Sequence, residues 1–181
     1  MLNAGHSAMH EAVAQELRGT EWQILPEASF AIYGERGVID ILAFRPASGS
    51  LLVVELKTAL VDVQGLIGAV DRSRRLARRI AADRGWSATS VSSWVVLRDS
   101  ATNHRRLAAH ATVLRSAFPA DGRRVRAWLR RPAGQISALG FLSVGHGGTL
   151  IPGTTATQRV RRPFSSVRIG REPIYQSPGA H

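Results

Sequence analysis

The spacing of apolar positions predicts a helix at the start of the chain. In residues 6–19, Met9, Val13 and Leu17 recur every four residues, which places them on one face of a helix. Gly19 follows at the position of a helix C-cap. We therefore expect an amphipathic first helix.

A set of strands follows this helix. Each run combines β-branched or other apolar residues and is bounded by turn residues, as at 34–37 and 46–50. The apolar run at 38–44 is interrupted by Asp40, which we expect in or beside the core. The predicted strands are 22–25 and 29–33 (one interrupted strand or two short ones), 38–44, 51–57, a central strand at 91–97 and an edge strand at 125–129.

Two further helices are predicted between and after these strands. Residues 62–83 and 104–118 both show helical spacing of apolar residues. The apolar positions are Leu66, Ala69, Leu76 and Ile80 in the first, and Leu107, Ala111 and Leu114 in the second.

The order of elements, α-β-β-β-α-β, predicts one α/β domain with a mixed sheet flanked by helices. We place this domain at residues 1–146, with 134–144 left unassigned. From residue 147 onward the chain is rich in Gly, Pro, Ser and Arg and loses its periodicity. Residues 147–181 are therefore predicted to form a disordered basic tail.

The charge balance points to an anionic partner. The 181 residues include 24 basic and 13 acidic ones, a formal net charge of +11. Such an excess attracts polyanions such as nucleic acid, although an anionic membrane surface would be attracted too. Cysteine is absent, which excludes disulfides and thiolate metal sites. Without a signal-peptide pattern or a run of about 20 apolar residues, we expect a soluble cytoplasmic protein and no membrane partner.

Three residues on neighbouring predicted strands carry the most informative pattern. Glu55 and Lys57 are two apart in a strand, so they point to the same face. A regular hairpin at 46–50 would bring the carboxylate of Asp40 towards that of Glu55. We therefore expect two carboxylates and one ammonium to converge in apolar surroundings.

Such a cluster suits a divalent cation. Buried carboxylates repel each other, and Mg²⁺ relieves this because it takes oxygen ligands. A metal-bound water beside an ammonium suits phosphodiester hydrolysis. All but one of the 24 basic residues are arginine, so the single lysine, Lys57, stands out. A compact ammonium whose pKa responds to burial differs from a guanidinium in this role.

The pattern resembles the PD-(D/E)XK nuclease superfamily. The similarity rests on Gly-Val-Ile-Asp at 37–40 and Val-Val-Glu-Leu-Lys at 53–57, and it covers roughly residues 6–98. It implies a restriction-endonuclease-like fold and hydrolysis of DNA with Mg²⁺ or Mn²⁺. It also implies that Asp40, Glu55 and the Leu56 carbonyl bind the metal, that Lys57 assists hydrolysis, and that Glu11 of the first helix completes the site.

Two departures from the superfamily pattern leave alternatives open. Ile39 stands where a proline often precedes the aspartate. On a helical wheel, Glu16 lies nearer the apolar face of the first helix than Glu11 does, so it is the physical rival for that role. Glu27 and Glu35 are lesser candidates. A buried structural salt bridge is the alternative for the whole cluster.

Other residues were weighed for binding. Arg72, Arg75 and Arg79 line one flank of the helix at 62–83 and could contact nucleic-acid phosphates, or they could form a solvated face. His6 and His10 are four apart on the first helix, but without an evident third ligand we assign them to structure or surface.

The sequence thus predicts a Mg²⁺- or Mn²⁺-dependent deoxyribonuclease. Cutting both strands of a duplex often requires a dimer, so a homodimer is left open. The leading alternative is a noncatalytic DNA-binding or regulatory protein with a degenerate site on the same fold. A second alternative is a structural subunit whose basic surface meets an acidic protein.

Overall fold

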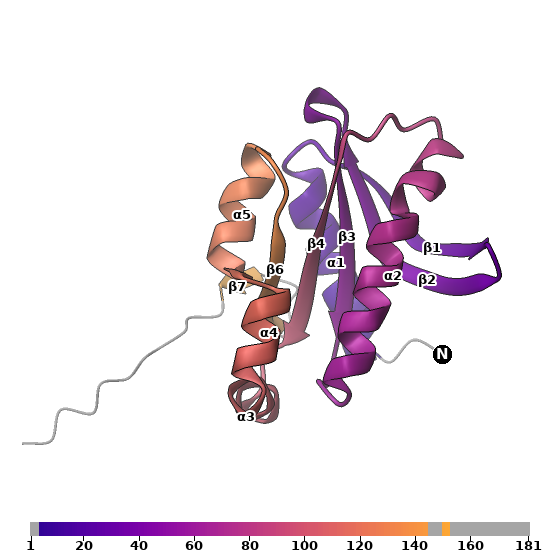
Figure 1. Cartoon of the computed structure of the whole chain (residues 1–181). Helices are drawn as coiled ribbons and strands as arrows, with labels where there is room; N and C mark the ends of the chain where they lie inside the picture. Colours follow the sequence, from indigo (N-terminus) through magenta and orange to yellow (C-terminus); the bar gives the residue numbers. More distant parts are fainter. Residues whose placement is uncertain (1–3, 145–149, 153–181) are drawn as a thin grey trace, which may run out of the picture.

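A computed structural model describes residues 4–144 and 150–152 as a sheet between two layers of helices (Figure 1). The helices are α1 (Ala4–Arg18), α2 (Val63–Ala82), α3 (Ala101–Ala109), α4 (Ala111–Ala117) and α5 (Gly122–Arg130), with a 3-10 turn at Pro46–Ser48. The strands are β1 (Gln23–Ile32), β2 (Glu35–Arg45), β3 (Ser50–Lys57), β4 (Ser90–Arg98), β5 (Ala120–Asp121), β6 (Ser137–Val144) and β7 (Leu150–Pro152).

The sheet is mixed, with strand order β1-β2-β3-β4-β6-β5. The pairs β1–β2 and β2–β3 are antiparallel, whereas the pairs β3–β4, β4–β6 and β6–β5 are parallel. β5 pairs with residues 138 and 139 of β6. Further along the same strand, β7 pairs antiparallel with residues 142–144. Helix α2 is the crossover that connects the parallel strands β3 and β4.

Helices cover both faces of the sheet. Met9, Val13 and Leu17 of α1 pack in one core cluster with Trp128 of α5 and Trp94 of β4. On the opposite face, apolar residues of α2 and α4 pack with those of β4 and β6 in a second cluster, and α2 also packs on β2 and β3. In the described part of the chain, no helix is both long and apolar enough to cross a bilayer.

Most of the predicted elements are confirmed. The first helix, the strands at 38–44, 51–57 and 91–97 and the long helix at 62–83 are present, and the α/β class with a mixed sheet is as expected. The uncertain region 22–33 is one ten-residue strand, β1. The predicted helix at 104–118 is two helices, because His110 departs from helical geometry (φ −115°, ψ 23°).

One element was predicted wrongly. Residues 125–129 form part of helix α5 rather than an edge strand. The side chain of Asp121 caps this helix by accepting a hydrogen bond from the Arg124 amide at 2.8 Å. Val125, Trp128 and Leu129 are buried at i, i+3 and i+4, which is helical spacing within a segment too short to show it clearly.

The C-terminal region is only partly covered by the structure. The unassigned residues 134–144 contain β6. Within the predicted tail, residues 150–152 form β7, and the remainder of residues 147–181 lies outside the described residues.

Asn103 fixes the loop that follows β3. Its side chain is buried, accepts a hydrogen bond from the Leu60 amide at 2.9 Å, and donates to the carbonyls of Thr58 and Arg98 at 3.1 and 2.8 Å. Arg106 of the same helix donates to the Leu60 carbonyl at 2.8 Å. Helix α3 therefore holds the loop between β3 and α2 against the end of β4.

We predict that Asn103→Ala lowers the free energy of unfolding by about 2–3 kcal/mol, because it leaves buried backbone groups unsatisfied. Chemical denaturation monitored by circular dichroism measures the loss. The matched control is Thr102→Ala at the neighbouring exposed position of α3. Equal stabilities for the two variants would show that Asn103 does not anchor the loop.

Candidate functional site

The candidate site lies where β2 and β3 separate. Their ladder ends at the pair Ile41–Val54. Beyond this pair, the amide of Leu56 donates a hydrogen bond to Oδ2 of Asp40 at 2.7 Å. Figure 1 shows the β1–β2 ribbon turning away from β3. The Asp40 carboxylate therefore takes the place of a backbone acceptor at the point where the strands diverge.

Asp40 also lies at an irregularity in the β1–β2 ladder. The ladder pairs Pro26 with Ile41 and Ala28 with Ile39, and it is interrupted between these pairs. Glu27, in the interruption, has a φ of 46°, a conformation that is unfavourable for a residue with a side chain. Ile39 and Ile41 pack in core clusters on opposite faces of the sheet. Such local strain is often found at functional sites.

Glu55 and Lys57 lie beside Asp40 at the end of β3. Glu55 is only 7% exposed, and its Oε1 is 2.7 Å from Nζ of Lys57. Burial raises the pKa of Glu55, the negative charge of Asp40 raises it further, and Lys57 and His6 oppose this increase. Because the Leu56 amide binds Asp40 Oδ2, the Asp40 carboxylate lies beside the residue that follows Glu55, and its charge contributes to the raised pKa of Glu55.

Two histidines of α1 contact Asp40. His6 Nε2 is 3.5 Å from Asp40 Oδ1, and His10 Nε2 is 3.1 Å from the Asp40 carbonyl oxygen. The other ring nitrogen of His6, Nδ1, is buried without a hydrogen-bond partner. The sequence analysis had assigned both histidines to structure or surface. The signal in the sequence was their spacing of four residues, which places both on one face of α1. The residue that both contact is Asp40 of β2.

Neither glutamate proposed for the first helix lies in this group. Glu11 is exposed and pairs with Arg18 at 3.6 Å, and it accepts a hydrogen bond from Gln15. Glu16 is largely buried and pairs with Arg126 of α5 at 3.0 Å. Burial raises the pKa of Glu16, and Arg126 opposes the increase. Among the described contacts, α1 reaches Asp40 through His6 and His10 instead.

The predicted phosphate-binding arginines lie along α2 and have acidic partners. Arg72 and Arg75 pair with Glu35 of β2 at 3.4 and 2.8 Å. The hydrogen bond from Arg75 lowers the pKa of Glu35. Arg79 pairs with Asp83 at 3.6 Å. All three arginine side chains are at least 45% exposed, so they remain accessible to solvent.

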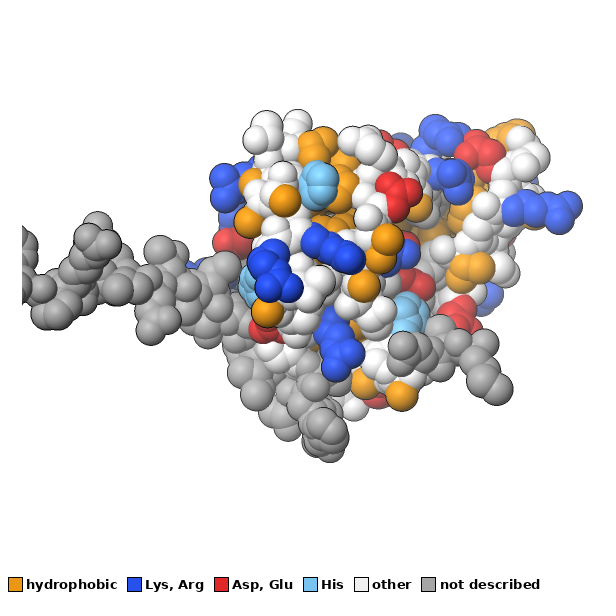
Figure 2. All heavy atoms as spheres, turned by 90° about the horizontal axis from the view of Figure 1, so that it is seen from below, with side chains coloured by type: hydrophobic (Ala, Val, Ile, Leu, Met, Phe, Trp, Pro, Cys, Tyr) orange, Lys and Arg blue, Asp and Glu red, His pale blue; other side chains and the backbone are white. Residues whose placement is uncertain are grey.

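Basic side chains on one end of the molecule are not gathered into a single patch (Figure 2). Figure 2 views the end of the molecule where the β3–α2 loop and α3 lie. Basic side chains on this face are interspersed with hydrophobic and acidic ones. The net charge therefore does not form one continuous block on this face.

Asp40 and Glu55 supply carboxylate oxygens, which are the type of ligand that hard divalent cations take. Among residues 4–144, no three His, Asp or Glu side chains form a ready-made metal-binding group. A cation here would therefore rest on the carboxylates of Asp40 and Glu55 and on water. Mg²⁺ is commonly held in this way, by one or two carboxylates with several waters retained.

We predict that Glu55→Gln makes the metal-free protein more stable at neutral pH. Because the pKa of Glu55 is raised in the folded state, its ionisation costs stability, and this cost appears as the pH rises through the raised pKa. The gain in melting temperature should therefore be small below the ordinary pKa of glutamate, about 4.3, and grow as the pH rises above it. The exposed Glu11→Gln serves as control. A Glu55→Gln gain that is largest in acid would contradict the electrostatic assignment.

Comparison with known proteins does not place the chain in a family. No protein-family model matches it, and no curated protein is significantly similar.

Proposed function

We propose that the protein hydrolyses phosphodiester bonds in DNA with Mg²⁺ or Mn²⁺, on a restriction-endonuclease-like version of the α/β fold. The observation that carries this proposal is the convergence of Asp40 and Glu55 where β2 and β3 separate, with Lys57 2.7 Å from Glu55. Two neighbouring carboxylates at the end of an apolar strand lower the stability of the fold unless a bound cation compensates their charge.

Each residue has a role that its position supports. Asp40 and Glu55 would hold the cation, with the Leu56 carbonyl as a further ligand. When bound, the cation would polarise the phosphate and lower the pKa of a water. The Lys57 ammonium would orient the attacking water and balance charge that develops on the phosphate. His6, 3.5 Å from Asp40, would position the aspartate from α1, whereas Glu11, which the resemblance implied would complete the site, has no role in this proposal.

A polyanionic substrate agrees with the charge of the chain. The formal net charge is +11, and phosphate contacts supply much of the affinity of DNA-binding proteins. Arg72, Arg75 and Arg79 lie on the helix that follows Lys57, so they are our candidates for phosphate contacts outside the metal site. Cleavage of both strands of a duplex would call for two active sites, as in a homodimer.

A noncatalytic role has one observation in its favour. The ammonium of Lys57 already compensates Glu55, so the pair could be a structural salt bridge in a DNA-binding protein with a degenerate site. That protein would bind DNA with a steep dependence on salt and would not require a divalent cation.

We predict that the purified protein, with Mg²⁺ or Mn²⁺, nicks supercoiled plasmid and cuts circular single-stranded DNA, and that Lys57→Ala lowers the rate about 10²- to 10³-fold. Loss of a charge-stabilising group in an active site has an effect of this size. Gel electrophoresis of timed samples gives the rates.

The control for this experiment is Arg115→Ala, which removes an exposed cation of α4. It should leave the cleavage rate close to that of the wild type. Cleavage that survives Lys57→Ala undiminished would mean that the activity belongs to a contaminant. DNA binding without any cleavage would favour the noncatalytic alternative.

A further inference from the structure

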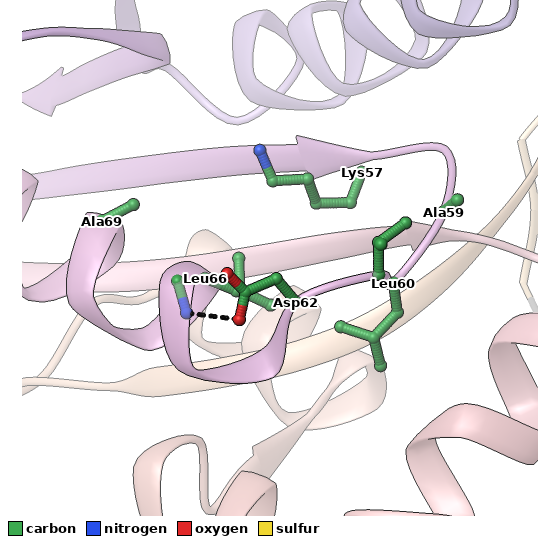
Figure 3. Close-up of a pocket in the computed structure, with 8 residues that line it drawn as sticks. Lys57, Ala59, Leu60, Asp62, Leu66 and Ala69 are labelled. Atoms are coloured by element: carbon green, nitrogen blue, oxygen red, sulfur yellow. Dashed lines mark hydrogen bonds between the residues drawn. The ribbon is translucent and has the colours of Figure 1, made fainter.

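A cavity of about 290 Å³ adjoins the candidate site. It lies between the end of β3, the loop after β3 and the first turns of α2 (Figure 3). This volume is just below the usual range for ligand pockets, about 300–1,000 Å³, so it suits a single small ring system. Its lining residues are Lys57, Ala59, Leu60, Val61, Asp62, Gly65, Leu66 and Ala69.

The walls of the cavity are mainly apolar. Leu60 and Leu66 are buried. Val61 is a large apolar residue that is 79% exposed to solvent. Figure 3 shows Lys57 on β3 and Asp62 at the start of α2 on different sides of the cavity, with the Lys57 ammonium directed back along β3. The cavity thus offers apolar walls with one cationic and one anionic side chain.

The cavity is poorly suited to a phosphate. The N-terminus of α2 would attract an anion, but Asp62 already caps it, with Oδ1 accepting a hydrogen bond from the Gly65 amide at 2.8 Å. The Asp62 carboxylate also repels a second anion. The one cation in the lining, Lys57, is paired with Glu55. A neutral ring with N–H donors fits better, because apolar walls contact its faces and a carboxylate accepts from its edge.

The wall formed by the loop is held in place before any ligand binds. The amide and carbonyl of Leu60 are bonded to Asn103 and Arg106 at 2.9 and 2.8 Å. A pocket wall that is already ordered loses little entropy on binding. This favours a defined ligand site over an incidental gap.

We propose that this cavity receives an unpaired nucleobase next to the phosphodiester bond that is cut, so that the substrate is single-stranded or locally unpaired DNA. The inference rests on the proposed function, since Lys57 belongs both to the cavity and to the candidate active site. A base within a duplex is stacked and paired, and it cannot enter such a pocket without leaving the helix.

The test measures how binding depends on the base. Fluorescence anisotropy in EDTA compares a labelled single-stranded oligonucleotide with one that carries consecutive abasic sites. Both have the same phosphates. The wild type should bind the intact strand about five- to tenfold more tightly, the low end of what one bound base contributes.

Ala69→Met fills the cavity from α2, and Ala59→Met fills it from the loop. Each should abolish the preference for the intact strand and leave affinity for the abasic strand unchanged. Gln64→Met is the matched control, because Gln64 is exposed on the same helix and does not line the cavity. Two filling variants are used so that the test survives if one fails to fold.

The outcomes separate this inference from the proposed function. Equal affinity of the wild type for both strands, or a preference that persists in both filling variants, overturns the base pocket. If the wild type still cleaves DNA in a Lys57-dependent manner, the proposed function stands without it. If base-dependent binding is found but no cleavage occurs with any divalent cation, the pocket stands and the nuclease proposal fails.

Discussion

The repulsion between two carboxylates at the end of an apolar sheet is the constraint on which the site depends. Glu55 is buried among core residues, and the charge of Asp40 makes its ionisation harder still. The protein offsets this with the Lys57 ammonium, with the Leu56 amide that binds Asp40, and with His6. Each of these contacts compensates part of the negative charge. A divalent cation would compensate it more directly.

The fold explains how this arrangement is held. β2 and β3 pair with each other as far as Ile41 and Val54. Beyond this pair, β2 remains paired with β1 only, and β3 with β4 only. The gap between diverging strands exposes backbone groups that side chains must satisfy, and Asp40 does so. The strained Glu27 and the break in the β1–β2 ladder lie beside the same residue. Strand divergence and local strain thus coincide with the charged group.

The sequence predicted the elements that combine length with clear periodicity. The first helix, the long helix after Lys57 and the strands around Asp40 and Glu55 were all visible as apolar patterns, and so was the placement of the three site residues on adjacent strands. Helix α5 was missed because residues 125–129 are few and the arginines of the whole helix, residues 123, 124, 126 and 130, mask its apolar face. The break at His110, where the backbone is not helical, has no counterpart in the apolar spacing of residues 104–118.

The residue of α1 that contacts the site could not be chosen from the sequence. On a helix, a small rotation decides which side chain faces the sheet, and the resemblance favoured Glu11 whereas the helical wheel favoured Glu16. In the structure Glu16 is taken by Arg126, more than a hundred residues away, and the first turn of α1 brings His6 to Asp40. The pairing with Arg126 depends on α5, the helix that was predicted as a strand. The wrong prediction for residues 125–129 thus hid the ion pair between Glu16 and Arg126.

Mn²⁺ binding followed by electron paramagnetic resonance tests the central claim most directly, because the signal of the free ion falls as the ion binds and no substrate is required. Our account predicts that the wild type binds a single Mn²⁺ ion, that Mg²⁺ displaces it, and that Asp40→Ala abolishes the binding. A wild-type protein that leaves the free-ion signal unchanged, or an Asp40→Ala variant that binds Mn²⁺ as well as the wild type does, would contradict it.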